Sequence, residues 1–492
     1  MRLNLANNRE TYLVYLFSFL FIAINAVTIA LEFYYFSLVP LALLIILVTV
    51  YSLDKLIYLA VFVVPLSFQL TSLIPGSSLN LSIPSEPLLA GILIFSPLKY
   101  LFDSKFDKKI LYHPVSIAIL FNLVWIFITS ITSTMPLVSF KFLISRLWFI
   151  VAFYLIATQI FRKIDQVRVY TWMYALSLLI VVGYAWSRLI PFGFLNQQAA
   201  HWVAQPFYTD HTSYGAVLAM LIPVFIGFVL TMKDLSLIRR VYSWAVLAVF
   251  LTAVLFSYTR AAWVSLIGAL GVFFVIRLRI KFVYLAILGF LAFGYLYSQR
   301  TQIIISLEQN RQDSSEDLAE HVRSISNVAT DVSNMERLNR WSCAWRMFKE
   351  KPVFGWGPGT YMFQYASFQI ERGKTEISTN AATLGNAHSE YIGPLAESGI
   401  FGPITFLSIV LASIFTGLKN WYTIRDRKIR ILSLSLVLGL ITYYLHGLLN
   451  NFLDTDKASV LFWGFTAAIV AISVYHREPE EGNDPAAVKN SE

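Results

Sequence analysis

The feature that most constrains the fold is a succession of long apolar runs separated by short polar segments. A helix that crosses the bilayer core needs about 20 apolar residues, and roughly fourteen such runs can be counted. Only 14% of the 492 residues are charged, against about 25% in a typical soluble domain. We therefore predict an all-α polytopic integral membrane protein with about 12–14 transmembrane helices. The expected spans cover residues 12–30, 34–52, 56–74, 86–102, 114–133, 140–161, 169–190, 213–231, 241–258, 261–276, 282–298, 390–418, 431–449 and 458–475.

Composition excludes several other classes of protein. The single cysteine, Cys343, rules out a disulfide within the chain and a multi-cysteine metal site. The net charge of +9 does not indicate nucleic-acid binding, because most lysines and arginines fall in short loops between apolar runs. The first apolar run starts near Tyr12 and has no small-residue cleavage site after it, so we interpret it as a span and not as a signal peptide.

Basic residues are concentrated in alternate loops, and this asymmetry predicts the orientation in the membrane. The loops that carry them are expected to be cytoplasmic, and both termini then lie on the same side. The residues that mark this side are Lys105, Lys108, Lys109, Arg162, Lys163, Arg168, Lys233, Arg239, Arg240, Arg277, Arg279, Lys281, Lys419, Arg425, Arg427, Lys428 and Arg430.

We divide the chain into four parts. Residues 1–298 form a transmembrane bundle of about eleven helices, residues 299–387 a long loop on the outer face, residues 388–475 the C-terminal transmembrane helices, and residues 476–492 a polar cytoplasmic tail. Apolar residues recur in the loop at spacings of three and four, which predicts an amphipathic helix on the membrane surface or over a cavity. These residues are Met335, Leu338, Trp341, Trp345 and Phe348.

A histidine, His388, stands where the long loop meets the next apolar run. A neutral imidazole can take a proton near pH 7, so His388 is a candidate general base. The alternative is a histidine that is hydrogen-bonded at a helix start for structural reasons. If this segment is one helix, Glu397 falls on the opposite face from His388 and Glu390 points elsewhere, so neither is placed to orient the imidazole. We expect Glu397 to cap, pack or pair within the bundle.

Several arginines lie on or near the outer side, against the orientation rule. An arginine at membrane depth is costly, so it normally faces a partner or a watery cavity. A guanidinium matches phosphate oxygens two at a time, so arginines converging from different segments would suit an anionic lipid headgroup such as a diphosphate. Arg260, in a very short junction, and Arg337 are the strongest candidates, followed by Arg340. Arg340 could instead point into solvent, and Arg146 and Arg188 could snorkel to the interface.

Other polar residues on the outer side are weaker candidates. Asp210 and His211 open an expected span from the same side and could join the site, or Asp210 could be an N-cap, with Thr212 competing for that role. The pair Asp454 and Asp456 resembles two metal ligands, but so short a motif does not predict a metal site. The sequence shows no Walker loop, zinc spacing or nucleophile elbow in a credible context.

Four segments, at residues 207–216, 258–262, 337–359 and 388–399, together resemble the O-antigen ligase and polymerase superfamily of bacterial membrane proteins, most of all an O-antigen ligase. Tyr258-Thr259-Arg260-Ala261-Ala262 is similar to the family's Ser-Arg-Gly/Ala signature. Asp210-His211-Thr212 departs from the commoner Asp-Pro-Asn, which leaves the role of His211 open. The resemblance covers roughly residues 205–465, and the earlier part of the chain contributes only its spans.

The resemblance implies transfer of a glycan from an undecaprenyl-diphosphate carrier to the lipid A-core oligosaccharide, at the periplasmic face of the bacterial inner membrane. It implies His388 as the base, and Arg260 and Arg337, joined by Arg340, as ligands of the diphosphate. The expected partners are the lipid-linked glycan, its acceptor and membrane lipids, with no nucleic acid, metal, nucleotide or other cofactor. Further candidate site residues are Asp210, His211, Tyr391 and Glu397.

Two alternatives remain open. A polymerase of the same superfamily would join two lipid-linked repeat units, so that the acceptor is a second carrier-linked glycan. A transporter of lipid-linked glycan is a more distant alternative. It would place charged residues near the middle of the spans, whereas the ionisable residues of this chain gather on one face. The bottom-up chemistry agrees with a transferase: a base takes the proton of the acceptor hydroxyl, and arginines hold the charge of the departing diphosphate.

Overall fold

A computed structural model describes residues 8–31, 36–37, 39–72, 81–103, 106–231, 236–299, 332–375, 378 and 385–477. It confirms the all-α membrane fold, because ten helices in these residues are long and apolar enough to cross a membrane. They are α1 (Asn8–Ala30), α4 (Pro114–Ile131), the continuous α5, η5 and α6 (Pro136–Ile150, Val151–Ile156 and Ala157–Ile160), α7 (Asp165–Leu189), α9 (His211–Thr231), α10 (Leu237–Phe256), α11 (Arg260–Arg277), α18 (Phe401–Thr423), α19 (Arg427–His446) and α20 (Asp456–Tyr475).

The remaining elements are shorter or less regular. The apolar helices α2 (Val39–Val63), α3 (Ser85–Asp103) and α12 (Phe282–Ser298) would bring the number of spans into the predicted range if they also cross. The small elements are η2 (Val64–Leu66), β1 (Phe68–Gln69), η3 (Leu70–Ser72), β2 (Ser82–Ile83), η4 (Lys108–Ile110), η6 (Ile190–Phe192), α8 (Gln197–Ala200), α15 (Val332–Glu350), α16 (Tyr361–Gln364), η7 (Tyr365–Phe368), η8 (Glu371–Gly373) and α17 (Ile392–Ser398). The two strands pair antiparallel, with Phe68 opposite Ile83.

The spans expected at residues 34–52 and 56–74 meet at a break at Ser52, which divides α2 into two helical parts joined by a kink. The second part ends at Val63 and is shorter than expected. Asp54 and Lys55, just after this kink, have exposed side chains. The non-helical backbone is confined to Ser52, at φ −151° and ψ 59°. After Val64, Pro65 cannot donate to a helix, and the chain turns into the short hairpin.

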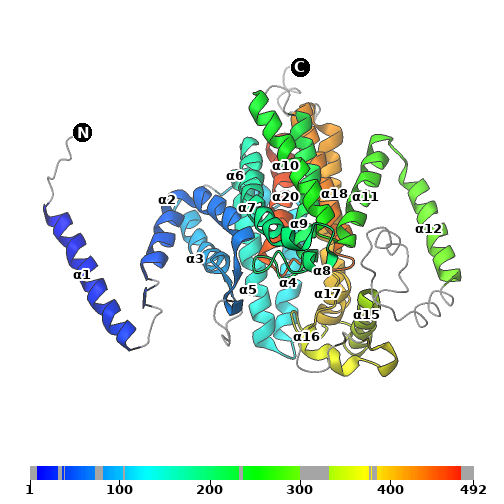
Figure 1. Cartoon of the computed structure of the whole chain (residues 1–492), viewed down its shortest axis with the longest axis horizontal. Coiled ribbons are helices and arrows are strands. Elements are labelled where there is room, and N and C mark those ends of the chain that lie inside the picture. The colour runs from blue at the N-terminus through cyan, green and yellow to red at the C-terminus, as the bar shows by residue number, and fades with distance from the viewer. Residues whose placement is uncertain are drawn as a thin grey trace, which may run out of the picture.

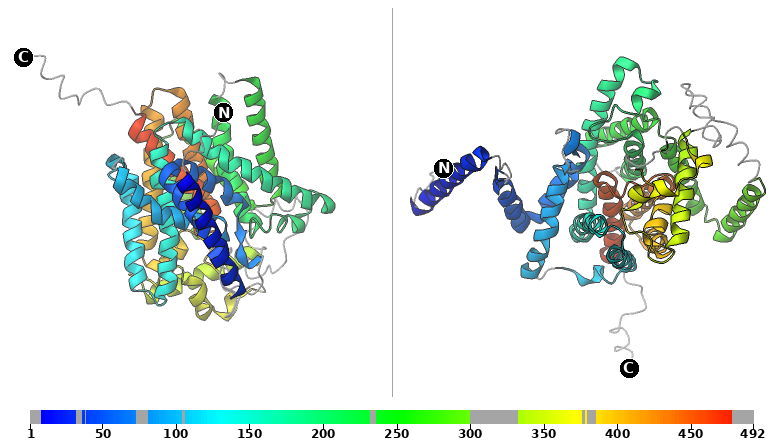
Figure 2. Two further views of the ribbon diagram at one scale, coloured as in Figure 1. Left: turned by 90° about the vertical axis from the view of Figure 1, so that its left-hand side faces the viewer. Right: turned by 90° about the horizontal axis from the view of Figure 1, so that it is seen from below.

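The centre of the molecule is formed by α9, α19 and α20, which pack against one another. α20 is buried from Asp456 to Ile472, and no part of it up to that point faces the outside of the bundle. α1 is the opposite case, since none of its apolar span is buried and it lies to one side of the bundle (Figures 1 and 2). The buried centre therefore comes from elements after residue 210, within the part of the chain that carries the sequence motifs.

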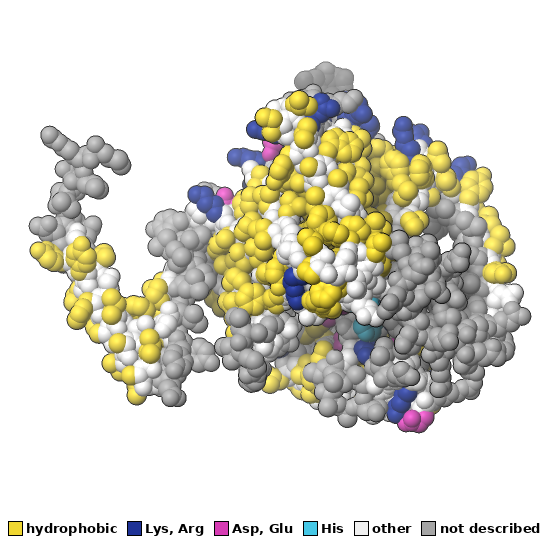
Figure 3. All heavy atoms as spheres, in the orientation of Figure 1, with side chains coloured by type: hydrophobic (Ala, Val, Ile, Leu, Met, Phe, Trp, Pro, Cys, Tyr) yellow, Lys and Arg dark blue, Asp and Glu magenta, His cyan; other side chains and the backbone are white. Residues whose placement is uncertain are grey.

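The two ends of the bundle differ in charge. Lysine and arginine side chains gather at the upper end in Figure 3. This is the end at which α11 stops, α10 starts, and α18 turns into α19. The other end holds the first residues of α9, α11 and α18 and the last residues of α19, so Arg260 and His446 lie there. α15, α16 and α17 cover this lower end (Figure 1).

α15 confirms the helix expected in the outer loop but presents a different face to the protein. Its buried residues are Glu336, Asn339, Arg340, Cys343, Ala344 and Met347. The predicted apolar stripe is only partly covered, and Trp345 is 50% exposed. The prediction followed apolarity alone, whereas polar groups of the buried face are satisfied by hydrogen bonds within the protein. The first part of the expected loop and most of the expected tail at 476–492 lie outside the described residues.

The span expected at 390–418 is interrupted at Gly399, which separates α17 from α18. Gly399 has φ +64°, a conformation that favours glycine. A Cβ there would lie 2.0 Å from the carbonyl oxygen of Val353. The adjacent Ile400 N–H donates to the carbonyl of Pro352 at 2.9 Å. The loop after α15 therefore packs against this break, which connects it to the bundle.

Candidate active site

His388 lies between α15 and α17, in a left-handed backbone conformation with φ +48°. Its N–H donates to Oδ1 of Asn386 at 3.1 Å. Nη1 of Arg340 lies 3.3 Å from Nε2 of its imidazole. A guanidinium has only donors, so Nε2 is the acceptor and the ring proton is on Nδ1. Burial, followed by the charges of Arg340 and Arg337, lowers the pKa of His388 to about 4, so the imidazole is neutral at pH 7.

Arg340 is held from several sides and is only 7% exposed, so it does not point into solvent. Its Nε donates to Oε1 of Glu336 at 2.7 Å, one helical turn earlier on α15. Its Nη1 donates to the carbonyl of Asn386 at 3.0 Å. A Cβ at Gly385 would lie 2.4 Å from that nitrogen, so a larger residue there would displace the guanidinium. This arrangement fixes Arg340 beside His388.

Glu336 is the buried carboxylate that neutralises this arginine. One oxygen accepts from Arg340, and the other accepts from Thr375 at 2.9 Å and from Ser378. Burial alone would raise its pKa, but the hydrogen bonds from Ser378, Arg340 and Thr375 lower the pKa below its ordinary value. The sequence prediction missed Glu336, although its position four residues before Arg340 is a known spacing for an ion pair on a helix.

Arg337 reaches the turn that follows α19. Its Nε donates to the carbonyl of Leu449 at 3.2 Å. Burial lowers the pKa of Arg337, the carboxylate of Asp210 opposes this change, and the nearby charge of Arg340 adds to it. Arg337 therefore lies close to both, and its charge also acts on His388.

Arg260 is the first residue of α11, and the backbone before it is set by specific contacts. Oγ1 of Thr259 donates to the carbonyl of His211 at 2.9 Å, which ties the start of α11 to the start of α9. A Cβ at Gly215, in α9, would lie 2.5 Å from Oγ1 of Thr259, so α9 and the start of α11 are in close contact. Tyr258 has φ +50°, and its hydroxyl donates to the carbonyl of Leu195 at 2.9 Å.

Asp210 is the N-cap of α9, as one of the two interpretations predicted. Its Oδ1 accepts from the main-chain N–H of Thr212 and from the hydroxyl of Thr212 at 2.5 Å. Nδ1 of His211 lies 3.8 Å from the same oxygen. The ring of His211 stacks on that of His201, with 4.0 Å between centroids. Burial lowers the pKa of His201, with Arg260 adding to the effect and Asp210 opposing it.

The structure thus brings most of the predicted residues to one place. Electrostatic contacts connect Asp210 with Arg337 and His388, and Arg337 with His388. His201 connects Asp210 with Arg260. Histidine and basic side chains are visible together in a recess at the lower middle of Figure 3. The sequence prediction missed His201, whose only signal was its place in the outer segment before Asp210.

His446, at the end of α19, is a second histidine that the prediction missed. It is 1% exposed, and its Nε2 contacts Nδ2 of Asn450 at 3.1 Å. Within the described part of the chain, its Nδ1 has no hydrogen-bond partner. Leu449, whose carbonyl binds Arg337, donates its own N–H to the carbonyl of His446 at 3.0 Å. The end of α19 therefore lies next to the arginine.

Tyr391 and Glu397 lie outside this group. The hydroxyl of Tyr391 donates to the carbonyl of Tyr444 at 3.0 Å. Oε1 of Glu397 accepts from the main-chain N–H of Tyr361 at 3.0 Å, so it caps α16, as its expected structural role implied. It faces a separate cavity of about 40 Å³, and burial raises its pKa to about 8.

The remaining arginines and aspartates that the sequence singled out are bound within the protein. Arg146 donates to Asp454 at 3.0 Å and is only 11% exposed, so it does not snorkel to the interface. Nη1 of Arg188 donates to the carbonyl of Gln205 at 2.5 Å, and its guanidinium lies over the ring of Trp202. Oδ2 of Asp456 accepts from two buried serines of the hairpin region, Ser67 and Ser85.

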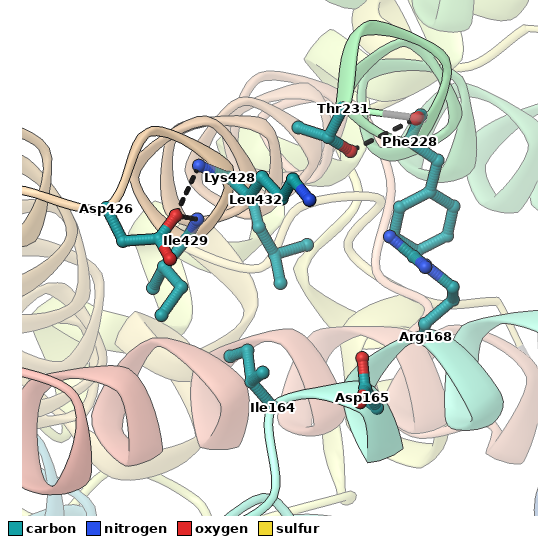
Figure 4. Close-up of a pocket in the computed structure, with 9 residues that line it drawn as sticks. All are labelled: Ile164, Asp165, Arg168, Phe228, Thr231, Asp426, Lys428, Ile429 and Leu432. Atoms are coloured by element: carbon teal, nitrogen blue, oxygen red, sulfur yellow. Dashed lines mark hydrogen bonds between the residues drawn. The ribbon is translucent and has the colours of Figure 1, made fainter. Parts of the chain in front are cut away.

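A cavity of about 200 Å³ lies at the opposite, basic end of the bundle (Figure 4). It is formed where α7 begins, α9 ends and α19 begins. The guanidinium of Arg168 lies over the ring of Phe228, 5.5 Å from its centroid. The carboxylate of Asp426 caps α19 by accepting from the main-chain N–H groups of Lys428 and Ile429. None of the predicted site residues lines this cavity.

Comparison with known proteins supports the resemblance seen in the motifs. The family model described as O-Antigen ligase matches residues 244–407. The match includes the start of α11, the whole of α15 and the His388 segment. No curated protein matches the chain. Residues 244–407 are therefore similar to the O-Antigen ligase family, and this similarity supports the superfamily to which the motifs pointed.

Proposed function

We propose that the protein transfers a glycan from an undecaprenyl-diphosphate carrier to the lipid A-core oligosaccharide, as an O-antigen ligase. The observation that carries this proposal is the contact between Arg340 and His388, with Arg337 beside them. A neutral imidazole accepts a proton, and adjacent guanidinium groups hold a diphosphate. These are the two functions that the transfer requires.

In the proposed reaction, Arg340 turns from Nε2 of His388 to the bound diphosphate, and Nε2 then takes the proton of an acceptor hydroxyl as its oxygen attacks the anomeric carbon of the donor sugar. The new bond joins the acceptor oxygen to that carbon, and the bond from the carbon to the diphosphate oxygen breaks. Undecaprenyl diphosphate leaves with the bonding electron pair. Arg260, Arg337 and Arg340 stabilise its added charge in a site of limited exposure, where such contacts are strong.

The charge of the donor also prepares the base. In the protein without substrate, burial and then the charges of Arg340 and Arg337 lower the pKa of His388 to about 4, which makes the imidazole a weak base. A diphosphate bound between these arginines offsets their field, so the pKa of His388 rises toward neutrality. Proton transfer is thereby favoured only when the donor is present.

The proposed location is the periplasmic face of the inner membrane. The site lies at the end of the bundle opposite the basic helix ends and connections at residues 237–240, 277–281 and 425–430. Loops rich in lysine and arginine remain in the cytoplasm, so the site end is the outer one. A donor activated on a lipid suits a compartment without sugar nucleotides.

The test is transfer by the purified protein, with lipid A-core and with a second carrier-linked glycan as alternative acceptors. Product on lipid A-core, lost in His388→Ala protein of unchanged thermal stability, supports the ligase. Elongation of the carrier-linked glycan alone would instead identify the polymerase. Full transfer by His388→Ala protein would remove the assignment of the base.

A further inference from the structure

The buried residue Glu390 connects the segment that carries His388 with the turn at residues 447–453, which contacts Arg337. Glu390 lies two residues after His388 and is 6% exposed. Its main-chain N–H donates to the carbonyl of Gly447, at the end of α19, at 2.8 Å. Its side chain turns to the other end of the same connection, between α19 and α20. The residue therefore has contacts at both ends of that turn.

The side-chain contacts all converge on one oxygen. Oε1 of Glu390 accepts from the main-chain N–H groups of Phe452 at 2.8 Å and Leu453 at 2.9 Å. It also accepts from the hydroxyl of Tyr443, on α19, at 2.5 Å. Main-chain N–H groups in a turn cannot be satisfied by a neighbouring turn of helix, so this carboxylate supplies the acceptor they need. Residues 447–453 are thus fixed from both sides by Glu390.

The turn held in this way carries the contact to Arg337. The carbonyl of Leu449, between the two ends bound by Glu390, accepts from Nε of Arg337 at 3.2 Å. Glycine at 447 allows the close approach, because a Cβ there would lie 3.1 Å from Cγ of Glu390. The positions of the base segment and of the arginine's acceptor therefore depend on the same side chain.

We propose that Glu390 is a positioning residue that keeps His388 in register with Arg337 through the turn at 447–453. It does not touch the reacting atoms. The inference rests on the proposed function for its effect on catalysis, and on geometry alone for its effect on His388. A displacement of about 1 Å can cost on the order of 100-fold in rate when reacting groups must be aligned.

The experiment compares Glu390→Ala with the conservative Glu390→Gln, whose amide oxygen can still accept from the turn. Asn420→Ala is the matched control. Asn420 is fully buried in α18 and has two hydrogen bonds, to the carbonyl of Ile469 and from Arg477, near the basic end. Each full-length variant is measured for thermal stability, for the rate at which diethyl pyrocarbonate modifies His388 by mass spectrometry, and for kcat and KM of transfer.

We expect Glu390→Ala to speed the modification of His388 and to lower kcat by on the order of 100-fold, with a smaller change in KM. Glu390→Gln should restore most of the wild-type modification rate and kcat. Asn420→Ala should lower stability and leave the modification rate and kcat unchanged. If Glu390→Ala lowers only stability, as the control does, the positioning role is overturned.

A second variant covers failure of Glu390→Ala to fold. Gly447→Val places a larger side chain against Cγ of Glu390 without removing the carboxylate, and we expect the same changes at His388 in a milder form. Unchanged modification of His388 in this variant would overturn the proposal. If the rate of His388 modification changes as expected but the wild-type protein transfers no glycan, the positioning role stands and the proposed function fails.

Discussion

Nη1 of Arg340 lies 3.3 Å from Nε2 of His388, and the same nitrogen donates to the carbonyl of Asn386 at 3.0 Å. The other edge of the guanidinium is bound to buried Glu336. The arginine is therefore fixed against the imidazole by the protein itself. Its charge depresses the proton affinity of His388 while keeping Nε2 free of a proton. An anion that shares the arginine changes this balance.

The first prediction concerns the pH dependence of transfer. Activity needs neutral His388, so it falls when the pH drops below the pKa of this residue. In the free protein that pKa is about 4, and kcat/KM should decline only near that pH. With the donor bound the pKa rises, so the acid limb of kcat should lie at higher pH than that of kcat/KM.

Arg340→Gln tests the cause of this shift. Without the positive charge, the pKa of His388 rises in the free protein, and the acid limb of kcat/KM should move to higher pH. Arg340→Lys keeps the charge and should move the limb less. Identical limbs in all three proteins would contradict an electrostatic role for Arg340 at the base.

The second prediction concerns Arg260. A lysine keeps the charge but cannot match two phosphate oxygens at once, so Arg260→Lys should reduce kcat/KM for the lipid-linked donor. A reduction of about tenfold corresponds to about 1.4 kcal/mol. Arg277→Lys is the control, because it makes the same change at the other end of α11, on an exposed residue. Equal turnover in both variants would exclude a bidentate contact at Arg260.

The third prediction concerns Gly385. A Cβ at this position would lie 2.4 Å from Nη1 of Arg340, so Gly385→Ala should push the guanidinium away from His388. We expect transfer to fall by about tenfold or more, since the alignment of the groups is lost. Gly271→Ala, in the middle of α11, is the control, because a Cβ there meets nothing within 4 Å. It should leave transfer unchanged and stabilise the helix by up to about 1 kcal/mol.

The sequence predicts the spans well where apolar runs are long, because burial in a membrane requires helix there. It also predicts the break at Ser52, between the two spans expected there. It misses breaks that depend on tertiary contacts. Gly399 does interrupt the span at 390–418, because a distant loop packs against it. Such contacts join residues far apart in the chain, and the periodicity of apolar residues along the sequence does not predict them.

The candidate site also has residues that the sequence predicts and residues whose roles depend on distant contacts. His388, Arg260 and Arg337 stood out from the sequence because charged groups are rare beside apolar runs. Arg340 could not be placed, since its burial depends on Glu336 and on the absence of a side chain at Gly385. The role of Glu390 was also hidden. Its partners lie more than fifty positions later in the chain.

The last prediction concerns Glu336 and stability. Its pKa is lowered in the folded protein, so its contribution is present above the ordinary value of about 4.3 and is lost as the pH falls below that value. Glu336→Gln removes this dependence and leaves the charge of buried Arg340 unpaired, which costs on the order of 3–5 kcal/mol. The melting temperature of the variant should therefore be lower at pH 7 and should change less as the pH is lowered below about 4. Glu371→Gln is the control, since the side chain of Glu371 is 88% exposed in its pair with Lys374, and exposed pairs contribute little. A variant at 336 that melts like the one at 371 would show that the buried ion pair does not stabilise α15 at the site.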